Sequence, residues 1–227
     1  MKNFRPQAIL LDFYGTIVEE DDAIIGSVCD EIARSSPVGA TAAEIGAYWG
    51  REFSHLCWQS FGVDFRAQKE LEQISLERVL RHFEANLDVR KLSQPIYEYW
   101  ARPQIYPESR AALARCRVPV CIVSNIDNTE LEAALKHHAL HFDWIVTSED
   151  CRAYKPRGEM FDKALSVLGL PADKVLHVGD SLSSDVRGAK AQGIAALWVN
   201  RKQRGIPGDD QAPDYVADNL TGLLDVL

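Results

Sequence analysis

Polar side chains able to do chemistry cluster after the most apolar segments of this chain, and a lysine joins them from the loop Tyr154-Lys155-Pro156. The set combines carboxylates, a hydroxyl, an amide and an ammonium group, and its members are Asp12, Ser124, Asn125, Lys155, Asp180 and Asp185. Carboxylate oxygens are the ligands that Mg²⁺ prefers, and a lysine offsets the charge of an anion bound beside it. Taken singly, each residue is better explained as a turn cap, a loop residue or a surface ion pair. Together, and in this order, they predict a site for magnesium and an anionic group.

The apolar segments themselves have the pattern of buried parallel strands. They cover residues 8–11, 118–123, 144–146, 175–178 and 195–199. Continuous apolar runs of this length are typical of strands covered on both faces. Helical patterns, with apolar residues three and four apart, lie between them over residues 109–116, 129–138, 159–168 and 185–192. This alternation predicts an α/β fold with a Rossmann-like, doubly wound parallel sheet, in which ligands bind at the carboxyl ends of the strands.

Residues 19–101 differ, because they show no clear buried strand and an almost continuous helical period. Thr41 and Glu44 have the spacing of a capping box. The apolar residues that follow fall on one helix face, namely Ile45, Trp49, Phe53 and Leu56. We therefore predict an inserted all-helical domain over residues 19–101, and a core domain formed by residues 1–18 and 102–227.

Composition excludes several functional classes. The chain has 227 residues, and 25 lysines and arginines face 33 aspartates and glutamates, which gives a net charge of -8. This acidic balance argues against nucleic-acid and anionic-membrane partners. The apolar runs are far shorter than the roughly 20 residues that cross a bilayer, and the N-terminus lacks the apolar segment of a secretory signal. We expect a cytoplasmic protein, with its five cysteines reduced, that acts on a small and anionic molecule.

Four ordered motifs resemble those of the haloacid dehalogenase-like hydrolases. They are Asp12-Phe13-Tyr14-Gly15-Thr16, Ser124-Asn125, Tyr154-Lys155-Pro156 and Gly179-Asp180-Ser181-Leu182-Ser183-Ser184-Asp185. Four motifs in this order at strand ends are a specific signal, whereas the first alone is a moderate one. The helical insertion after the first motif is similar to the mobile cap domain of that family.

The resemblance implies a catalytic or binding role for each motif residue. Asp12 would be the nucleophile, forming a covalent aspartyl intermediate that water then hydrolyses. Ser124 and the backbone of Asn125 would hold the non-bridging oxygens of the transferred group. Lys155 would offset the negative charge of the nucleophile and of that group. Thr16 would fix the orientation of the Asp12 carboxylate.

The resemblance also implies a magnesium cofactor. Asp180 would bind Mg²⁺ together with Asp12 and the backbone carbonyl of Tyr14. Asp185 would hold either a metal-bound water or Lys155. These are hard oxygen ligands, which suit this ion.

Tyr14 departs from the pattern of most phosphatases in the family. Those enzymes carry a second aspartate at this position, which acts as general acid and base. A tyrosine there resembles the branch that cleaves the carbon-halogen bond of 2-haloacids without a metal. Other positions differ from that branch, because Asp180 and Leu182 replace small neutral and amide residues, and Phe161 replaces a tyrosine. Its halide-binding arginine would align near Gly50 and Arg51.

Asp180 decides between the two branches. Its carboxylate beside that of Asp12, without a cation, would raise one pKa and disarm the nucleophile. We therefore predict magnesium-dependent, phosphatase-like hydrolysis of a small phosphorylated metabolite. The alternative is hydrolysis of carbon-halogen bonds, as in an L-2-haloacid dehalogenase. A second alternative is a catalytically degenerate binding protein, because the second aspartate is missing.

Overall fold

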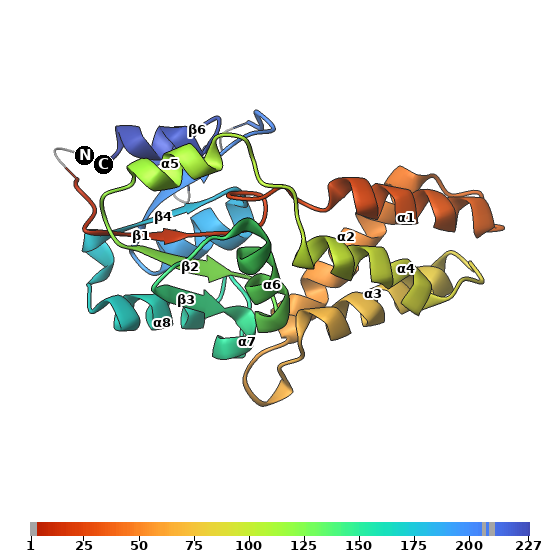
Figure 1. The fold of residues 1–227 in the computed structure, drawn as a ribbon. Helices are drawn as coiled ribbons and strands as arrows, with labels where there is room; N and C mark the ends of the chain where they lie inside the picture. Colours follow the sequence, from red (N-terminus) through yellow and green to blue (C-terminus); the bar gives the residue numbers. More distant parts are fainter. Residues whose placement is uncertain (1–3, 206–207, 209–211) are drawn as a thin grey trace. The chain divides into compact units, whose positions relative to one another are not determined.

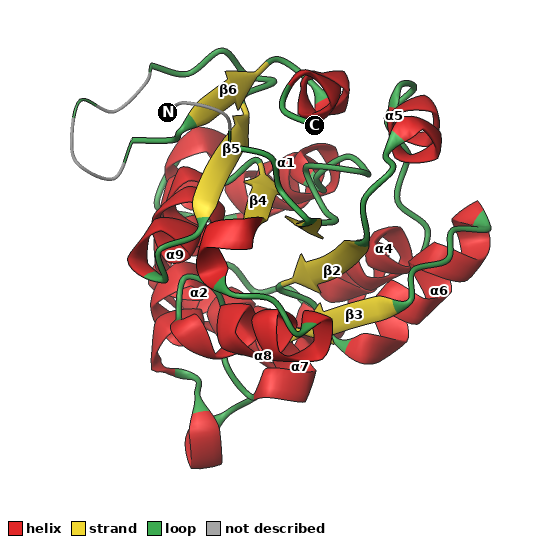
Figure 2. Cartoon of the chain, turned by 90° about the vertical axis from the view of Figure 1, so that its left-hand side faces the viewer, coloured by secondary structure: helices red, strands yellow, loops and turns green. Residues whose placement is uncertain are grey.

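A six-stranded parallel sheet organises one part of the chain, as the computed structural model shows for residues 4–205, 208 and 212–227. Its strands are β1 (Ala8–Leu11), β2 (Val120–Ser124), β3 (Trp144–Thr147), β4 (Val175–Gly179), β5 (Ala195–Val199) and β6 (Tyr215–Ala217). They lie in the order β3-β2-β1-β4-β5-β6 (Figures 1 and 2). This arrangement confirms the predicted α/β class and the Rossmann-like sheet.

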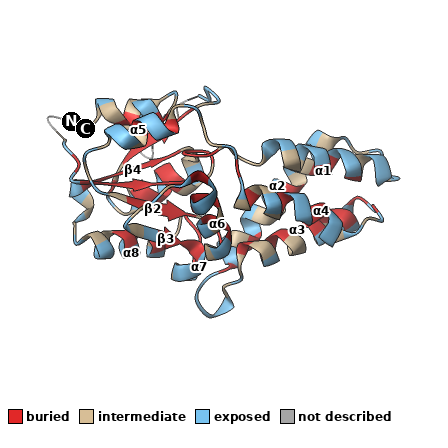
Figure 3. Cartoon of the chain, in the orientation of Figure 1, coloured by how far each residue is buried: buried red, intermediate tan, exposed pale blue. Residues whose placement is uncertain are grey.

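Helices cover both faces of this sheet. On one side are α7 (Ser148–Cys151), α8 (Gly158–Leu168) and α9 (Arg187–Ala191), with a π-helical turn η3 (Leu182–Val186) before α9 (Figure 2). On the other side, α5 (Ser109–Arg115) packs against η4 (Leu220–Asp225), and the turn η2 (Ala172–Lys174) precedes β4. The strands are the most buried part of this unit (Figure 3).

The central position of β1 explains why polar groups gather at one edge of the sheet. All four residues of β1 are fully buried, as expected for a strand with neighbours on both sides and helices on both faces. Leu11 is in register with Ile122 of β2 and with Val178 of β4. Because the three strands run parallel, the residues that follow them emerge at the same carboxyl edge.

A second compact unit, the helical unit, comprises residues 21–103 and 126–139. Its helices are α1 (Asp22–Ser35), α2 (Ala42–Gln59), α3 (Gln68–His82), α4 (Val89–Ala101) and α6 (Asn128–His138), with a short turn η1 (Gly62–Asp64). The other described residues form the sheet unit. Sequence analysis assigns α6 to the core domain instead. The order of elements along the chain does not show that α6 packs against α4. No helix in the described ranges is both long and apolar enough to cross a membrane.

The predicted start of α2 is confirmed. The backbone N–H of Thr41 donates to Glu44 Oε2 at 2.8 Å, and the N–H of Glu44 donates to Thr41 Oγ1 at 3.3 Å. This reciprocal pair satisfies two donors that a helix start leaves without partners. Trp49 on the buried face of α2 also donates from its indole to Ser75 Oγ of α3 at 2.9 Å. The helices of this unit are thus joined by a polar bond as well as by apolar packing.

Glu72 is a buried carboxyl group within the helical unit. It is only 4% exposed, and its Oε1 has no hydrogen-bond partner among the described residues. Burial, with a smaller contribution from the Asp21 carboxylate, raises the pKa of Glu72 from 4.5 to about 8. The folded protein therefore keeps a proton that the unfolded chain loses. As a result, the free energy of unfolding falls as pH rises between these two values.

We expect Glu72→Gln to remove this fall, because glutamine is neutral at every pH. Its free energy of unfolding should match that of the native chain near pH 5 and exceed it by roughly 4 to 5 kcal/mol at pH 9. Urea unfolding between these pH values measures the difference. Glu77→Gln, an exposed position on the same helix, controls for the loss of a charge. Parallel pH profiles for the native chain and Glu72→Gln would contradict the prediction.

Candidate active site

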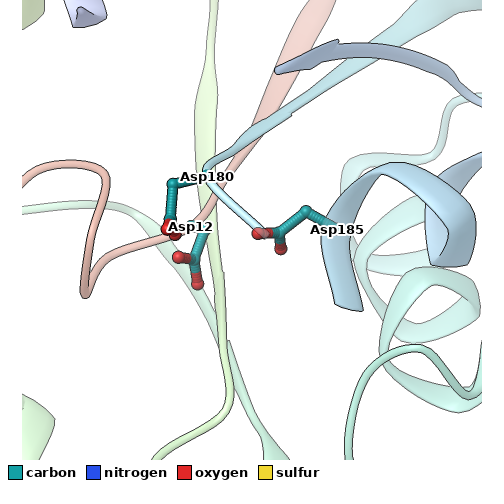
Figure 4. A group of neighbouring side chains, drawn as sticks. All are labelled: Asp12, Asp180 and Asp185. Carbon is teal, nitrogen blue, oxygen red and sulfur yellow. The ribbon is translucent and has the colours of Figure 1, made fainter. Parts of the chain in front are cut away.

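Three aspartates converge at the carboxyl edge of the sheet. Asp12 follows β1 and Asp180 follows β4, while Asp185 lies in the turn η3 (Figure 4). One carboxylate oxygen of each lies within 4.8 Å of the others. The structure thus brings together three residues that the sequence singles out for chemistry. Ser124, at the end of β2, is also buried at this edge.

Lys155 joins two of these aspartates. Its Nζ donates to Asp12 Oδ1 at 2.8 Å, to Asp185 Oδ1 at 2.6 Å and to the carbonyl oxygen of Val123 at 2.7 Å. Each of the three ammonium protons therefore has its own acceptor. Burial lowers the pKa of Lys155, but the two carboxylates outweigh it and raise the pKa to about 12. The side chain is therefore a fixed positive charge beside Asp12.

Asn125 has a role in this structure that the sequence does not reveal. Its Oδ1 accepts the backbone N–H of Lys155 at 2.7 Å, and its Nδ2 donates to the Lys155 carbonyl at 3.1 Å. The amide side chain thus fixes the backbone of the lysine loop against the end of β2. Sequence reasoning assigns a role only to the Asn125 backbone, because the pairing depends on how two distant loops meet.

Both carboxylate oxygens of Asp12 have partners. Lys155 holds Oδ1, and Thr16 Oγ1 lies 3.4 Å from Oδ2, which is a long hydrogen bond. The backbone N–H of Asp12 donates to the Val178 carbonyl at 2.9 Å. Burial raises the pKa of Asp12 to about 6, Lys155 opposes this shift, and Asp185 adds to it. Thr16 therefore lies where the resemblance implies an orienting residue.

Of the three aspartates, Asp180 has the carboxylate whose negative charge is least compensated by neighbouring groups. Burial raises its pKa well above the ordinary value, and the Asp185 and Asp12 carboxylates raise it further. Its backbone carbonyl accepts hydrogen bonds from Trp198 Nε1 at 2.8 Å and from the Arg204 guanidinium at 2.6 Å. Neither Trp198 nor Arg204 belongs to a motif, so sequence reasoning misses both. The carboxylate is thus held close to like charges by a fixed backbone.

Gly15 makes the approach of Asp180 possible. Its φ of +82° lies in the left-handed region, and a Cβ at this position would lie 2.5 Å from Asp180 Oδ1. A larger residue would therefore push the Asp180 carboxylate away from the loop that follows Asp12. The glycine of the first motif is required by this close contact as well as by its backbone conformation.

Asp185 is fully engaged by donors of the protein. Its Oδ1 accepts from Lys155 and from His177 Nε2, the latter at 3.0 Å, while its Oδ2 accepts the Ser181 N–H at 3.0 Å. Burial raises the pKa of Asp185, but Lys155 and His177 outweigh it and hold the pKa well below the ordinary value. Of the two roles that the sequence leaves open for Asp185, these bonds provide the contact with Lys155. His177 is not part of any motif.

Two positions at which 2-haloacid-cleaving enzymes carry a tyrosine and an arginine are occupied by Phe161 and, near the second, Arg51. Phe161 is fully buried on α8, and its ring meets that of His177 edge-on at 5.1 Å between centroids. It therefore offers no hydroxyl group to the site. Arg51 is an exposed residue of the helical unit whose guanidinium lies 6.0 Å from the Tyr48 ring centroid. Tyr14 lies two residues after Asp12 in the loop, with its ring edge-on to that of Phe13.

The known proteins that this chain resembles belong to one family, but they include enzymes with different activities. A family model described as haloacid dehalogenase-like hydrolase matches residues 6–193. Haloacid dehalogenase-like hydrolase domain-containing protein 3 of Danio rerio is 34% identical over 150 residues, which are 63% of this chain and 61% of that protein. The (S)-2-haloacid dehalogenase of Pseudomonas sp. (strain YL) is 25% identical over 97% of this chain and 94% of its own length.

Among the sequence relatives, phosphatases also match, over shorter stretches. The phosphoserine phosphatase of Thermus thermophilus is 32% identical over 140 residues, which are 58% of this chain and 54% of that protein. Among solved structures, the L-2-haloacid dehalogenase RSc1362 superposes with a TM-score of 0.81 at 20% identity, covering 97% of both chains. At this identity the structural likeness shows the fold, and the site residues must decide the chemistry.

Proposed function

This chain belongs to the haloacid dehalogenase-like hydrolase family, and on that premise we propose that it is a magnesium-dependent hydrolase of small phosphorylated molecules. One observation carries the proposal: the Asp180 carboxylate lies beside Asp12 and Asp185, and Lys155 is the one cation hydrogen-bonded to this group among the described residues. Carboxylates this close repel one another unless further positive charge is bound. A divalent cation would remove that repulsion.

The side chains present fit magnesium. Asp12 and Asp180 would hold the ion with the backbone carbonyl of Tyr14, all of them hard oxygen donors. Asp185 is less suited to direct ligation, because both of its oxygens already accept hydrogen bonds from the protein. When bound, magnesium would neutralise charge on the transferring phosphoryl group.

Asp12, Ser124 and Lys155 would each have a separate role in phosphoryl transfer. One Asp12 oxygen would form a bond to phosphorus as the bond to the leaving oxygen breaks, which yields an aspartyl phosphate. The Ser124 hydroxyl would donate to a non-bridging oxygen, and Lys155 would keep its charge beside the reacting carboxylate. Water would then attack phosphorus, release inorganic phosphate and restore the Asp12 carboxylate.

Dehalogenation of 2-haloacids is the second candidate, and the relatives favour it. The sequence relatives that span nearly the whole chain include haloacid dehalogenases, whereas the phosphoserine phosphatase matches a little over half of it. Tyr14 also fits that branch. In that reaction Asp12 would attack carbon, expel halide and form an ester that water cleaves. Asp180 and Phe161 argue against it, because the first adds an unneeded charge and the second lacks a hydroxyl.

A matched substrate panel separates these candidates. Acetyl phosphate, 4-nitrophenyl phosphate and L-2-chloropropionate are each incubated with the protein, with magnesium or with a chelator. We expect phosphate release that requires magnesium and no release of chloride. Chloride release that persists in chelator would favour the dehalogenase. Absence of both activities in a folded protein would favour a binding protein.

Tyr14 should limit the range of phosphate esters that the protein cleaves. A tyrosine phenol ordinarily has a pKa of about 10, which is poorly matched to proton transfer near neutrality. Alkyl phosphates, whose leaving alkoxide needs a proton, should react slowly. Acyl and aryl phosphates should react faster because they leave as stabilised anions. We therefore expect rates to depend steeply on the pKa of the leaving group.

We expect Tyr14→Asp to raise kcat/KM for alkyl phosphates by roughly 10- to 100-fold, because a carboxyl group can protonate the leaving oxygen. Acyl phosphates should gain little. Kinetics across a graded series of esters measures this effect, and Tyr14→Asn controls for the loss of the ring without adding an acid. A flat dependence on the leaving group in the native chain would mean that another group already supplies the proton.

A further inference from the structure

His177 is a polar residue in an otherwise apolar layer. It lies in the middle of β4, in register with Leu10 of β1 and Ala196 of β5, and its side chain is fully buried. Leu10, Ala196 and Val175 of the same sheet face belong to the apolar core under α8 and α9. An imidazole at this position needs a reason, because a buried polar group is costly unless a partner compensates for lost water.

The imidazole of His177 contacts Asp185 and Phe161. Nε2 lies 3.0 Å from Asp185 Oδ1, while Nδ1 has no partner among the residues that the structure describes. The Phe161 ring meets the imidazole edge-on. Since the Asp185 carboxylate also accepts from the Lys155 ammonium, it is an acceptor, and Nε2 must be the donor. Asp185 is thus the one side-chain hydrogen-bond partner of His177 among the described residues.

Asp185 transmits this contact to the nucleophile. Its Oδ1 is shared by His177 and Lys155, and its Oδ2 is fixed by the Ser181 N–H. Gly179 leaves room for this orientation, because a Cβ there would lie 2.3 Å from Asp185 Cγ. Lys155 in turn donates to Asp12. A continuous chain of buried hydrogen bonds therefore runs from β4 to the Asp12 carboxylate.

We propose that His177 is a positioning residue, which holds Asp185 so that the Lys155 ammonium stays on Asp12. The kinetic consequence rests on the function proposed above, whereas the structural consequence does not. Without the Nε2–H donor, Asp185 Oδ1 is held by Lys155 alone, so the acceptor that balances the bond of Lys155 to Asp12 is less firmly positioned. Residues that orient ligands and catalytic groups in this indirect way typically contribute about 10- to 100-fold to activity.

Two substitutions of His177 separate the effect of the lost hydrogen bond from the effect of altered packing. His177→Leu fills a similar volume without a donor, whereas the side-chain amide of His177→Gln reaches about as far as Nε2 and donates. We expect the leucine variant to lose about 10- to 100-fold in kcat for acetyl phosphate with KM nearly unchanged. The glutamine variant should stay within about threefold of the native chain. Val175→Ala, two residues away on the same face, should lower thermal stability without lowering kcat.

A second readout does not require the proposed activity. The ¹⁵N–¹H correlation of the Lys155 ammonium should be protected from solvent exchange in the native chain and in His177→Gln, and should be lost or shifted in His177→Leu. If the leucine variant fails to fold, His177→Asn replaces it, because its amide is too short to reach Asp185. An unchanged Lys155 signal in the variant without the donor would overturn the proposal. Equal losses of kcat in folded glutamine and leucine variants would also overturn it.

Discussion

Asp12→Asn should lower kcat by at least about 10,000-fold while leaving the fold intact, which is the largest effect expected of any substitution in this chain. An amide is a poor nucleophile, so no covalent intermediate can form. The change is nearly isosteric, and Lys155 keeps its bonds to Asp185 and to the Val123 carbonyl. Steady-state kinetics and thermal unfolding of the purified variant together measure both parts of the expectation.

Asp180→Asn is the matched control, because it also removes one buried charge from the same cluster but leaves the nucleophile. Raising the magnesium concentration should restore part of the activity of Asp180→Asn and none of that of Asp12→Asn. The native protein should also carry a transient phosphoryl group that Asp12→Asn lacks, detectable by rapid acid quenching and mass spectrometry. A folded Asp12→Asn protein that turns over at the native rate would show that another group attacks the substrate.

Lys155→Met is expected to damage both stability and activity. The methionine keeps the apolar stem but removes the ammonium that separates Asp12 from Asp185. Removing one partner of a buried ion pair typically costs about 3 to 5 kcal/mol, because the other charge is left uncompensated. The repulsion should raise the pKa of Asp12 further and leave less carboxylate to attack, so we also expect kcat to fall by about 1,000-fold or more.

Lys190→Met provides the comparison for this substitution. Lys190 pairs with Asp214 at 2.9 Å in the same unit, but its side chain is 26% exposed, against 2% for Lys155. A partly exposed pair is worth about 1 kcal/mol or less, so this variant should lose little stability and no activity. Urea unfolding of the two variants measures the contrast. Equal losses of stability would mean that the buried charges of Asp12 and Asp185 are compensated by something other than Lys155.

The sheet could be predicted from sequence because its central strands have an unambiguous pattern. Residues 8–11 are a continuous apolar run and residues 175–178 are apolar apart from His177, and both are strands between two neighbours. The strand β6 could not be predicted from apolar runs, because the three residues of Tyr215–Ala217 are too few to form a recognisable one. The helix predicted from residue 185 begins instead at Arg187, after a π-helical turn. Ser181 Oγ accepts the Ser184 N–H there, which orders the turn locally.

The residues of the site could be predicted from the sequence, but the hydrogen bonds that join them could not. The motif residues are recognisable because carboxylate and hydroxyl side chains follow apolar strands, with the lysine in a loop between them along the chain. His177, by contrast, lies inside a strand, and only the register of β4 and the turn that follows bring it to Asp185. Trp198 and Arg204 reach the Asp180 carbonyl from the next strand and its loop, which no local pattern records.

The most direct test of the account is phosphate release from acetyl phosphate by metal-stripped protein as magnesium is added. Asp12 and Asp180 lie too close to remain charged together without a cation, so turnover should be absent in chelator and should rise to saturation with magnesium. In parallel, Asp180→Asn should need at least about tenfold more magnesium for half-maximal rate. Full turnover by the metal-stripped protein, or the same magnesium requirement in both proteins, would contradict the account.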